Sequence, residues 1–415
     1  MSTEQKKIIR VLNRFFKTDT AYLLHGVGWL GGAKLLGSIF SFGLVVAFAN
    51  LLPAESYGTY SYVMAAVSII ALTSLPGIDS SLVRSVARGF DDSFKIAQRV
   101  RLRWSVIGAT ILILVSAYYW YQNNLFLSTF FLAGGLLFPA FTSFTLFAPY
   151  LNGKKQFRRL AITKVVVKFL FAVTLTVGLI FSDNVALLIA LNLGVVALTG
   201  VFFTIKIVKQ LSSIKSSAPE PGLISYGKHL TVMSILDTTS KYLDKILLWH
   251  FFGPVQVAIW AFAYTPIQIA QGMIKKTLGT LAMPKFAQNN FDLTKKQLPA
   301  KVVKLFLILI PFALLYVLIS PVLFAQLFPQ YIDSVIYSQV LIALLLLIPF
   351  NFFSAFLMAH ARKRELYFIK IGFGLTSVGS LLIFIPLFGL WGAAIAHITA
   401  MTVRSTMSLF LFSRA

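Results

Sequence analysis

Four charged side chains lie close together at 237–245, inside the stretch 226–252, which is long enough to cross a bilayer as a helix. Asp237, Lys241, Asp244 and Lys245 are spaced at i, i+4, i+7 and i+8, so one helical face would carry all four charges. Charges at bilayer depth are energetically costly and rarely face lipid. The pattern therefore predicts a helix whose charged face lines a water-filled or substrate-filled interior.

Two interpretations of this face follow from the residue types. In the first, Lys241 and Lys245 contact an anionic substrate, and Asp237 or Asp244 titrates or binds a coupling cation. In the second, the helix neutralises itself, because Asp237 and Lys241 form an i,i+4 pair and Lys241 and Asp244 an i,i+3 pair. A buried ion pair does not by itself indicate function.

Further candidate charges lie in other apolar runs. Lys34 sits near the middle of a glycine-rich run, where it would face a central cavity or snorkel and pair with a carbonyl. Asp79, Arg84 and Arg88 follow Pro76-Gly77 and would form a cytoplasmic gate, an anion-capture site or an inner-leaflet anchor. Lys168, one turn from Lys164, has the same alternatives. The cationic set expected to bind an anion is Lys34, Arg84, Lys168, Lys241 and Lys245, and the ion candidates are Asp79, Asp237 and Asp244.

Several chemistries find no support in the sequence. There is no cysteine, no phosphate-binding GxxxxGK[ST] motif, and no His/Asp/Glu spacing typical of a metal site. The five histidines are scattered and are expected to be interfacial or packing residues. No pair of carboxylates is placed for acid–base work. We therefore expect no catalytic residues, no metal, no cofactor and no enzymatic activity.

The elements that position these charges are predicted to be transmembrane helices. The chain of 415 residues is 58% hydrophobic and only 12% charged, which is typical of an all-α polytopic membrane protein. Twelve apolar runs are long enough to span a bilayer. They lie near 23–49, 57–83, 104–122, 125–149, 161–181, 184–206, 226–252, 255–274, 304–327, 335–358, 367–388 and 390–411.

The basic residues alternate between the two sides of this layout. All but Lys34, Lys241 and Lys245 of the 37 Lys and Arg residues fall at the ends or connections of one side. This positive-inside asymmetry predicts that both termini are cytoplasmic, with 1–22 as an amphipathic cytoplasmic segment. The charge of +24 is therefore expected to meet anionic membrane lipids and not nucleic acid.

The chain divides in the middle. The Ser- and Pro-rich stretch 210–222 is predicted to be a cytoplasmic linker between an N-lobe, 23–209, and a C-lobe, 223–415, each with six helices around a central cavity. The lobes echo each other at an offset of about 200 residues, since FANLLPAESYGTYSY and LWHFFGPVQVAIWAF share an apolar exit and a proline turn. Such repeats are typical of alternating-access transporters.

Several segments resemble the polysaccharide flippases of the Wzx type, in the multidrug/oligosaccharidyl-lipid/polysaccharide exporter superfamily. The segments are the proline turn before Tyr57-Gly58-x-Tyr60, Gly77-Ile78-Asp79, Arg84 with the Ala-x-Gly after it, LNGKKQFRRLA (151–161) and GLWGAAIAHITA (389–400). The resemblance covers the whole chain through its twelve-span layout.

The resemblance implies a flippase that moves an undecaprenyl-diphosphate-linked oligosaccharide repeat unit across the bacterial plasma membrane, for O-antigen, lipopolysaccharide or another surface polysaccharide. It also implies a cationic central cavity for the diphosphate, and Lys34, Lys241 and Lys245 match that cavity by location. Asp237 and Asp244 depart from it by reducing the positive charge. A coupling ion, H⁺ or Na⁺, and a polymerase or chain-length protein are the further partners expected.

Three alternatives remain at this point. A drug or small-cation exporter of the same superfamily would have an acidic cavity, which Lys34, Lys241 and Lys245 oppose. A membrane transferase or polymerase would need outer loops with clustered carboxylates, and the outer loops here are short and nearly free of acids. The last alternative is a non-transporting membrane component of polysaccharide assembly.

Overall fold

In a computed structural model, the chain is described over residues 20–212, 219–288, 291–360 and 362–414. Every regular element in these ranges is a helix, which confirms the predicted all-α class. Most of the predicted segment 1–22 lies outside the described residues. The α-helices of the first half are α2 Thr20–Leu51, α3 Ala54–Ile70, α4 Ile78–Ala87, α5 Ser93–Tyr121, α6 Leu125–Ser143, α7 Phe147–Gly153, α8 Phe157–Phe181 and α9 Val185–Ser212.

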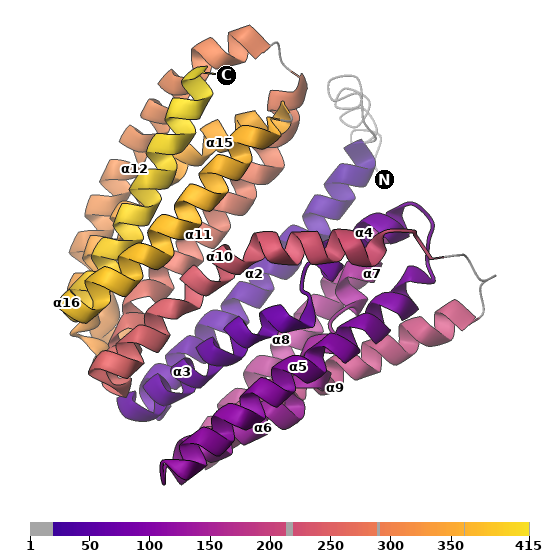
Figure 1. Ribbon diagram of the computed structural model, residues 1–415. Helices are drawn as coiled ribbons and strands as arrows, with labels where there is room; N and C mark the ends of the chain where they lie inside the picture. Colours follow the sequence, from indigo (N-terminus) through magenta and orange to yellow (C-terminus); the bar gives the residue numbers. More distant parts are fainter. Residues whose placement is uncertain (1–19, 213–218, 289–290, 361, 415) are drawn as a thin grey trace, which may run out of the picture. The chain divides into compact units, whose positions relative to one another are not determined.

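The second half continues the series (Figure 1). Its α-helices are α10 Leu223–Phe252, α11 Pro254–Gln288, α12 Phe291–Leu327, α13 Ser334–Leu341, α14 Ala343–Leu346, α15 Asn351–Ala359 and α16 Lys363–Arg414. Short 3₁₀ turns lie at η1 Ala71–Ser74, η2 Pro329–Tyr331 and η3 Ile348–Phe350.

Among the described residues, 8 helices are long and apolar enough to cross a membrane, or 9 when α3 with η1 and α4 are counted as one interrupted span. The protein is therefore a multi-pass membrane protein. The number twelve and the cytoplasmic termini stay predictions. Three differences separate the counts. The helix α10 carries five charges, and α11 is not among the helices that are apolar enough. The helix α16 contains both of the last predicted spans, merged across the non-helical residue Gly389 (φ 56°, ψ −126°).

The sequence explains where α10 gives way to α11. Gly253 adopts a left-handed φ of 83°, which glycine tolerates because it has no Cβ, and its N–H donates to the carbonyl of Trp249 at 3.0 Å. Pro254 then occupies the first position of α11, where its missing N–H leaves no hydrogen bond unmade. This glycine–proline pair ends one helix and starts the next without a loop.

The helices group into two compact units. Unit 1 contains 1–45, 70–182 and 186–232, and unit 2 contains 46–69, 183–185 and 233–415. Helices α2 and α10 each contribute to both units. Unit 1 has a core of buried side chains from α4, α5, α7, α8 and α9, among them Ile78, Leu82, Phe94 and Tyr150.

Unit 2 has two clusters of buried side chains. The larger one joins α10, α11, α13, α14 and α16, and includes Leu248, Trp260 and Leu381. The smaller one joins α12, α15 and the end of α16 through Leu298, Phe353 and Phe412. Together they fix α10 against α11 and α16, which are the helices that position the charges considered next.

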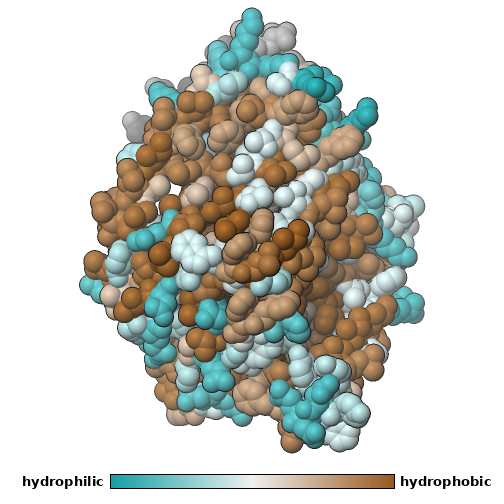
Figure 2. All heavy atoms as spheres, turned by 60° about the vertical axis from the view of Figure 1, so that its left-hand side comes forward, coloured by the Kyte–Doolittle hydropathy of each residue, from teal (hydrophilic) through white to brown (hydrophobic). Residues whose placement is uncertain are grey.

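Large apolar side chains cover much of the protein surface, as Figure 2 shows for one face. Leu318 on α12 is 75% exposed and Leu387 on α16 is 67% exposed. In water such a surface would be an aggregation hazard, but against hydrocarbon it has no energetic penalty. The outer faces of these helices are therefore suited to contact lipid.

Candidate cationic cavity in unit 2

The charged face of α10 opens onto a cavity of about 820 Å³ that lies entirely within unit 2. Asp237 and Lys241 line it directly. Asp244 lies deeper and is only 1% exposed, whereas Lys245 is half-buried and is not among the lining residues. One face of α10 thus supplies both the wall of a cavity and a buried carboxylate behind it.

Basic side chains outnumber acidic ones around the cavity. Lys241 comes from α10, while Lys370 and Arg404 come from the two arms of α16, and Asp237 is the carboxylate among the lining residues. Asp237 pairs with Lys370 at 3.2 Å. Arg404 stacks over the Phe373 ring at 5.1 Å, and its buried Nε has no hydrogen-bond partner among the described residues. The cavity therefore has surplus positive charge on its walls.

The observed ion pairs differ from those expected if α10 neutralised its own charges. Asp237 pairs with Lys370 of α16, and Asp244 pairs with His397 of α16, at 3.1 Å. Within the described residues, neither carboxylate forms an ion pair with Lys241. Cross-helix pairing leaves the ammonium of Lys241 over the neighbouring Tyr242 ring, 5.0 Å from its centroid.

The remaining walls are suited to a polar, ring-containing molecule. Neutral hydrogen-bonding groups and aromatic rings alternate with apolar side chains around the cavity. They are Ser240, Tyr264, Gln268, Gln271, Asn351, Phe352, Ser354, Phe373 and Ser377. Amides and hydroxyls can donate to and accept from sugar hydroxyls, and aromatic faces can stack on sugar rings. A second cavity in unit 2, about 610 Å³, carries Asp333 and no basic residue in its lining.

Asp244 is the most fully hydrogen-bonded charged group in this region. Its Oδ2 accepts from the Trp260 indole N–H at 2.7 Å and lies 3.1 Å from Nε2 of His397. Its Oδ1 accepts from the backbone N–H of Lys245 at 2.8 Å. The sequence had indicated Asp244 as an ion candidate, but had assigned His397 only a packing role.

The other predicted cations lie in unit 1. Lys168 of α8 packs its aliphatic stem over Gly37 of α2, where a Cβ would lie 3.6 Å from the lysine Cγ, and its ammonium lies 5.5 Å from the Phe171 ring centroid. Lys34, one turn before Gly37, is half-buried on the same helix. Both lysines are therefore held on helices of one unit, and their contact with an anion stays a prediction.

Asp79 forms an ion pair with Arg101 of α5, a partner that the sequence did not suggest. The Arg101 side chain is 7% exposed, and its Nε lacks a hydrogen-bond partner in the described part of the chain. This pair joins α4 to α5 inside unit 1. The prediction that Asp79 binds a coupling ion is not tested by this geometry.

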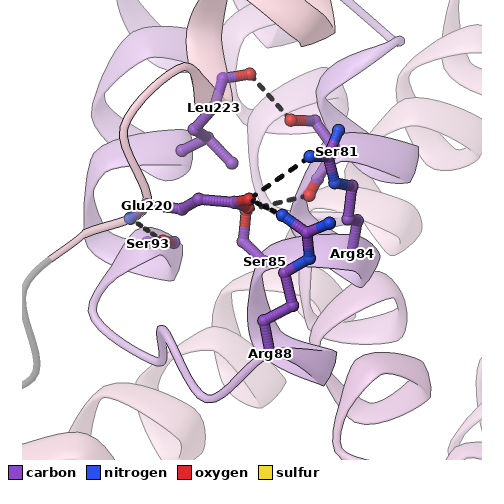
Figure 3. Close-up of polar contacts among 7 residues, drawn as sticks. All are labelled: Ser81, Arg84, Ser85, Arg88, Ser93, Glu220 and Leu223. Carbon is purple, nitrogen blue, oxygen red and sulfur yellow. Dashed lines mark hydrogen bonds and ion pairs between the residues drawn. The ribbon is translucent and has the colours of Figure 1, made fainter.

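Arg84 lies in a polar cluster where the stretch before α10 meets α4 (Figure 3). Glu220 accepts from the Ser85 hydroxyl and from Arg88 Nη1, the latter at 2.7 Å, and lies 3.7 Å from Arg84. The Glu220 N–H donates to Ser93 Oγ at 3.0 Å. We call Glu220 with these four partners the linker cluster.

The linker cluster stabilises the charged form of Glu220. The pKa of Glu220 is lowered from its ordinary value, first by the hydrogen bond from the Ser85 hydroxyl. Burial opposes this effect, and Arg88 and Arg84 add smaller lowering effects. Close by, the Ser81 hydroxyl donates to the Leu223 carbonyl at 2.7 Å (Figure 3). Arg84 is thus engaged by a protein carboxylate, and it also lies over the Tyr226 ring at 4.9 Å.

Sequence reasoning missed Lys370, Arg404 and His397 as cavity residues. Lys370 and Arg404 were counted with the basic ends of their spans, although Arg404 lies nearly three turns before the end of α16. His397 stands alone among apolar residues in GLWGAAIAHITA, which gave no sign of its partner 153 residues earlier. Of these three residues, Arg404 alone could have been identified from the sequence as a cavity residue, because of its position inside the span.

The fold is similar to that of transporters in the multidrug/oligosaccharidyl-lipid/polysaccharide (MOP) superfamily. A lipid II flippase, MurJ, in an inward closed conformation matches with a TM-score of 0.71 and 13% identity, over 92% of this chain and 87% of that one. An inward-facing multidrug resistance MATE transporter matches with a TM-score of 0.66 and 14% identity, over 91% of this chain and 94% of that one.

A MOP superfamily transporter from Pyrococcus furiosus, described as having a binding pocket of reverse polarity, also matches. Its TM-score is 0.63 and its identity 16%, over 94% of this chain and 95% of that one. At these identities the likeness establishes the fold. None of the curated proteins matches this chain.

The family model for polysaccharide biosynthesis proteins matches residues 23–290, which is more than half of the chain. The match includes α10, with the charged face that lines the cavity, and the linker cluster. It confirms the polysaccharide-biosynthesis part of the predicted resemblance, and the solved structures confirm the fold that the resemblance implied. The chain belongs to the polysaccharide biosynthesis protein family.

Proposed function

We propose that the protein is a flippase that moves a polyprenyl-diphosphate-linked oligosaccharide from the inner to the outer leaflet of a bacterial plasma membrane. The observation that carries this proposal is the unit 2 cavity, in which Lys241, Lys370 and Arg404 surround neutral amides, hydroxyls and aromatic rings. A diphosphate needs positive charge and N–H donors, and sugars need hydrogen-bonding groups and ring faces.

The physical task of the cavity is to replace water around the head group. A diphosphate with its sugars cannot enter hydrocarbon without losing its hydration, which is prohibitive for an unpaired charge. The cations supply charge-assisted hydrogen bonds in place of water, while a polyprenyl tail can stay in lipid beside the apolar outer helix faces. Alternation of access then moves the head group, as the fold of the matching transporters suggests.

The surplus of basic residues favours this function over the export of a cationic drug. A site for a small cation would have an excess of carboxylates, whereas Asp237 is outnumbered by three bases and is already paired with Lys370. Lys241 and Arg404 are left to meet an anion. Lys34 and Lys168 of unit 1 are proposed as further contacts for the same head group.

The test is complementation of a bacterial strain that lacks its own repeat-unit flippase, scored by surface polysaccharide at matched membrane levels of protein. We expect the wild type to restore the polymer, and Lys241→Ala and Arg404→Ala each to reduce it by about tenfold or more, since a charge-assisted hydrogen bond contributes about 1.5–3 kcal/mol. Lys301→Ala is the matched control, because Lys301 is exposed on α12 and forms its hydrogen bond with Gln297, outside the cavity lining.

Each outcome has a distinct meaning. If the wild type restores the polymer and both cavity variants match it, the flippase function stands but the cavity assignment is wrong. If the wild type fails with every repeat unit supplied, yet lowers the accumulation of a cationic dye in cells, the exporter function replaces the one proposed. Lys34→Ala and Lys168→Ala in the same assay test the unit 1 contacts.

A further inference from the structure

The back of the unit 2 cavity holds a carboxylate and an imidazole that the proposed anion site does not use. Asp244 is buried, and His397, with 11% of its side chain exposed, lines the cavity in front of it. The Trp260 and Tyr264 rings pack against the imidazole, with centroids 5.6 and 5.0 Å from it and 5.7 Å from each other. The imidazole is thus the third ring of a compact aromatic cluster, with one edge toward the carboxylate.

The hydrogen bonds assign the two ring nitrogens of His397. An ionised carboxylate only accepts hydrogen bonds, so Nε2, at 3.1 Å from Asp244 Oδ2, is the nitrogen that carries hydrogen. Nδ1 of the neutral ring is then a proton acceptor, and the described residues offer it no hydrogen-bond donor. The ring can therefore take a second proton without breaking its bond to Asp244.

We propose that His397 and Asp244 form a proton-binding switch that sets the charge of the cavity and so its affinity for the anionic head group. This inference rests on the proposed flippase function and adds a proton as the second ligand of the same site. Nδ1 takes one proton from hydronium and leaves a water molecule, and it returns the proton to water on release. The carboxylate of Asp244 compensates the charge of the imidazolium, which lowers the free-energy cost of a positive charge at this depth.

A metal cation is a poorer occupant of this site. Hard cations such as Na⁺ require several oxygen ligands. Both oxygens of Asp244 already face N–H groups, from Lys245, Trp260 and His397, whose positive ends would repel a cation. The described residues include no cluster of three or more His, Asp or Glu that could hold a metal ion. Of the two expected coupling ions, the geometry favours H⁺.

Charged and titratable side chains from several helices surround His397 and Asp244. From α10 come Asp237 on the cavity wall and Lys241 and Lys245 beside Asp244, and from α11 comes Tyr264. The helix α16 itself carries Lys370, which is paired with Asp237, and Arg404 on the cavity wall. Tyr316 of α12 and Tyr337 of α13 pack against the same buried cluster, and α15 contributes only uncharged lining residues. Because Asp237 is paired with Lys370, the lining of the empty cavity keeps a net positive charge from Lys241 and Arg404, which a bound diphosphate would neutralise.

The sign of the coupling follows from these charges. Protonation of His397 adds one positive charge to a cavity that already attracts an anion, so the head group binds more tightly to the protonated form. Linkage then requires that binding of the head group draws a proton onto His397. A unit charge added to the wall of a partly buried site changes the affinity of that site for an anion by about tenfold or more.

The experiment is calorimetric titration of the purified full-length protein in detergent with undecaprenyl diphosphate, in buffers of different ionisation enthalpy at several pH values. We expect the wild type to bind about tenfold more tightly near pH 5.5 than near pH 8, in the range where histidine titrates, and to take up a proton on binding. His397→Gln should lose both effects beyond the titration of the lipid itself. His397→Lys should bind tightly at both pH values.

His250→Gln is the matched control, because His250 is an exposed histidine at the end of the same α10. A proton uptake that His397→Gln retains in full would overturn the switch while leaving the flippase function intact. Absence of any binding by the wild type would instead count against the proposed function.

A second measurement is independent of substrate. In protein with ¹⁵N-labelled histidine rings, the His397 signals, assigned by their loss in His397→Gln, should change from the neutral to the charged pattern between about pH 8 and 5. A ring that stays in one protonation state over this range would overturn the proposal even if the flippase function is correct.

Discussion

The Nε2 atom of His397 lies 3.1 Å from Oδ2 of Asp244, although 153 residues separate the two in sequence. The same oxygen accepts the indole N–H of Trp260 at 2.7 Å. One carboxylate therefore joins α16, α11 and α10 within unit 2. Its hydrogen bonds have consequences for stability, because the indole of Trp260 and the imidazole of His397 are buried or nearly so.

Replacing Asp244 with alanine should lower the free energy of unfolding by about 1–3 kcal/mol, because it leaves the N–H groups of Trp260 and His397 without an acceptor. Asp244→Asn keeps one acceptor oxygen and should cost less. Thermal unfolding in detergent measures the difference. Asp183→Ala, which removes an exposed carboxylate, should leave the transition unchanged. Equal stability of Asp244→Ala and wild type would show that the network contributes nothing.

Gly389 should be intolerant of any side chain. Its φ of 56° and ψ of −126° lie in a region open essentially to glycine, and a Cβ there would lie 3.4 Å from the Phe252 ring. We expect Gly389→Ala to lower the free energy of unfolding by about 1–3 kcal/mol. Gly379→Ala is the control within the same helix, since a Cβ there meets nothing within 4 Å. If both variants melt alike, the turn is not under the constraint described.

Gly58 of α3 should also be intolerant of a side chain, in this case because there is no space for one. A Cβ at this position would lie 1.8 Å from the carbonyl oxygen of Pro254, which is backbone and cannot move without displacing the start of α11. Gly58→Ala should therefore cost about 3 kcal/mol. Gly43→Ala, where a Cβ meets nothing, should change stability by less than about 1 kcal/mol. Yield and thermal unfolding of the two variants provide the comparison.

The linker cluster should weaken at acid pH. The Ser85 hydroxyl and Arg88 hold the pKa of Glu220 below its ordinary value of 4.5, so the charged carboxylate stabilises the cluster above pH 4.5. This contribution is lost as the pH falls below 4.5 and through the lowered pKa. Hydrogen exchange of the Glu220 amide, which donates to Ser93, should be faster in Glu220→Gln than in wild type near pH 7.

The difference between Glu220→Gln and wild type should disappear when the pH falls well below 4.5, after correction for the intrinsic pH dependence of exchange. Glu55→Gln is the matched control, because it removes a carboxylate of α3 that lies outside the cluster. Equal protection of the Glu220 amide in Glu220→Gln and wild type at neutral pH would contradict the assigned role of the carboxylate.

The helical class and the charged face of α10 could be predicted because both depend on local patterns. Apolar runs of bilayer length require helices, and four charges at helical spacing must share a face. Cross-helix partners could not be predicted in this way. Asp237 meets Lys370 and Asp244 meets His397 only because α16 folds back on itself beside α10.

The structure gives a physical role to several residues in the segments that carried the family resemblance. Gly58 allows the approach of Pro254, and Gly77 allows the approach of α10, where a Cβ would lie 2.3 Å from the Gly227 carbonyl. In GLWGAAIAHITA, Gly389 forms the turn and His397 reaches Asp244. The sequence identified these segments as notable without revealing which contact each one makes.

The turn at Gly389 has a consequence for how this part of the protein enters the membrane. Its arms, 363–388 and 390–414, are each about 37–39 Å long at 1.5 Å per residue, enough to cross the hydrocarbon of a bilayer, and Figure 1 shows α16 returning toward the end where it began. Between Lys370 and Arg404 the chain carries no Asp, Glu, Lys or Arg. The arms can therefore leave the translocon as a single helical hairpin, with no polar loop to carry across. A reporter fused after Arg414 would then lie on the same side of the membrane as Lys363.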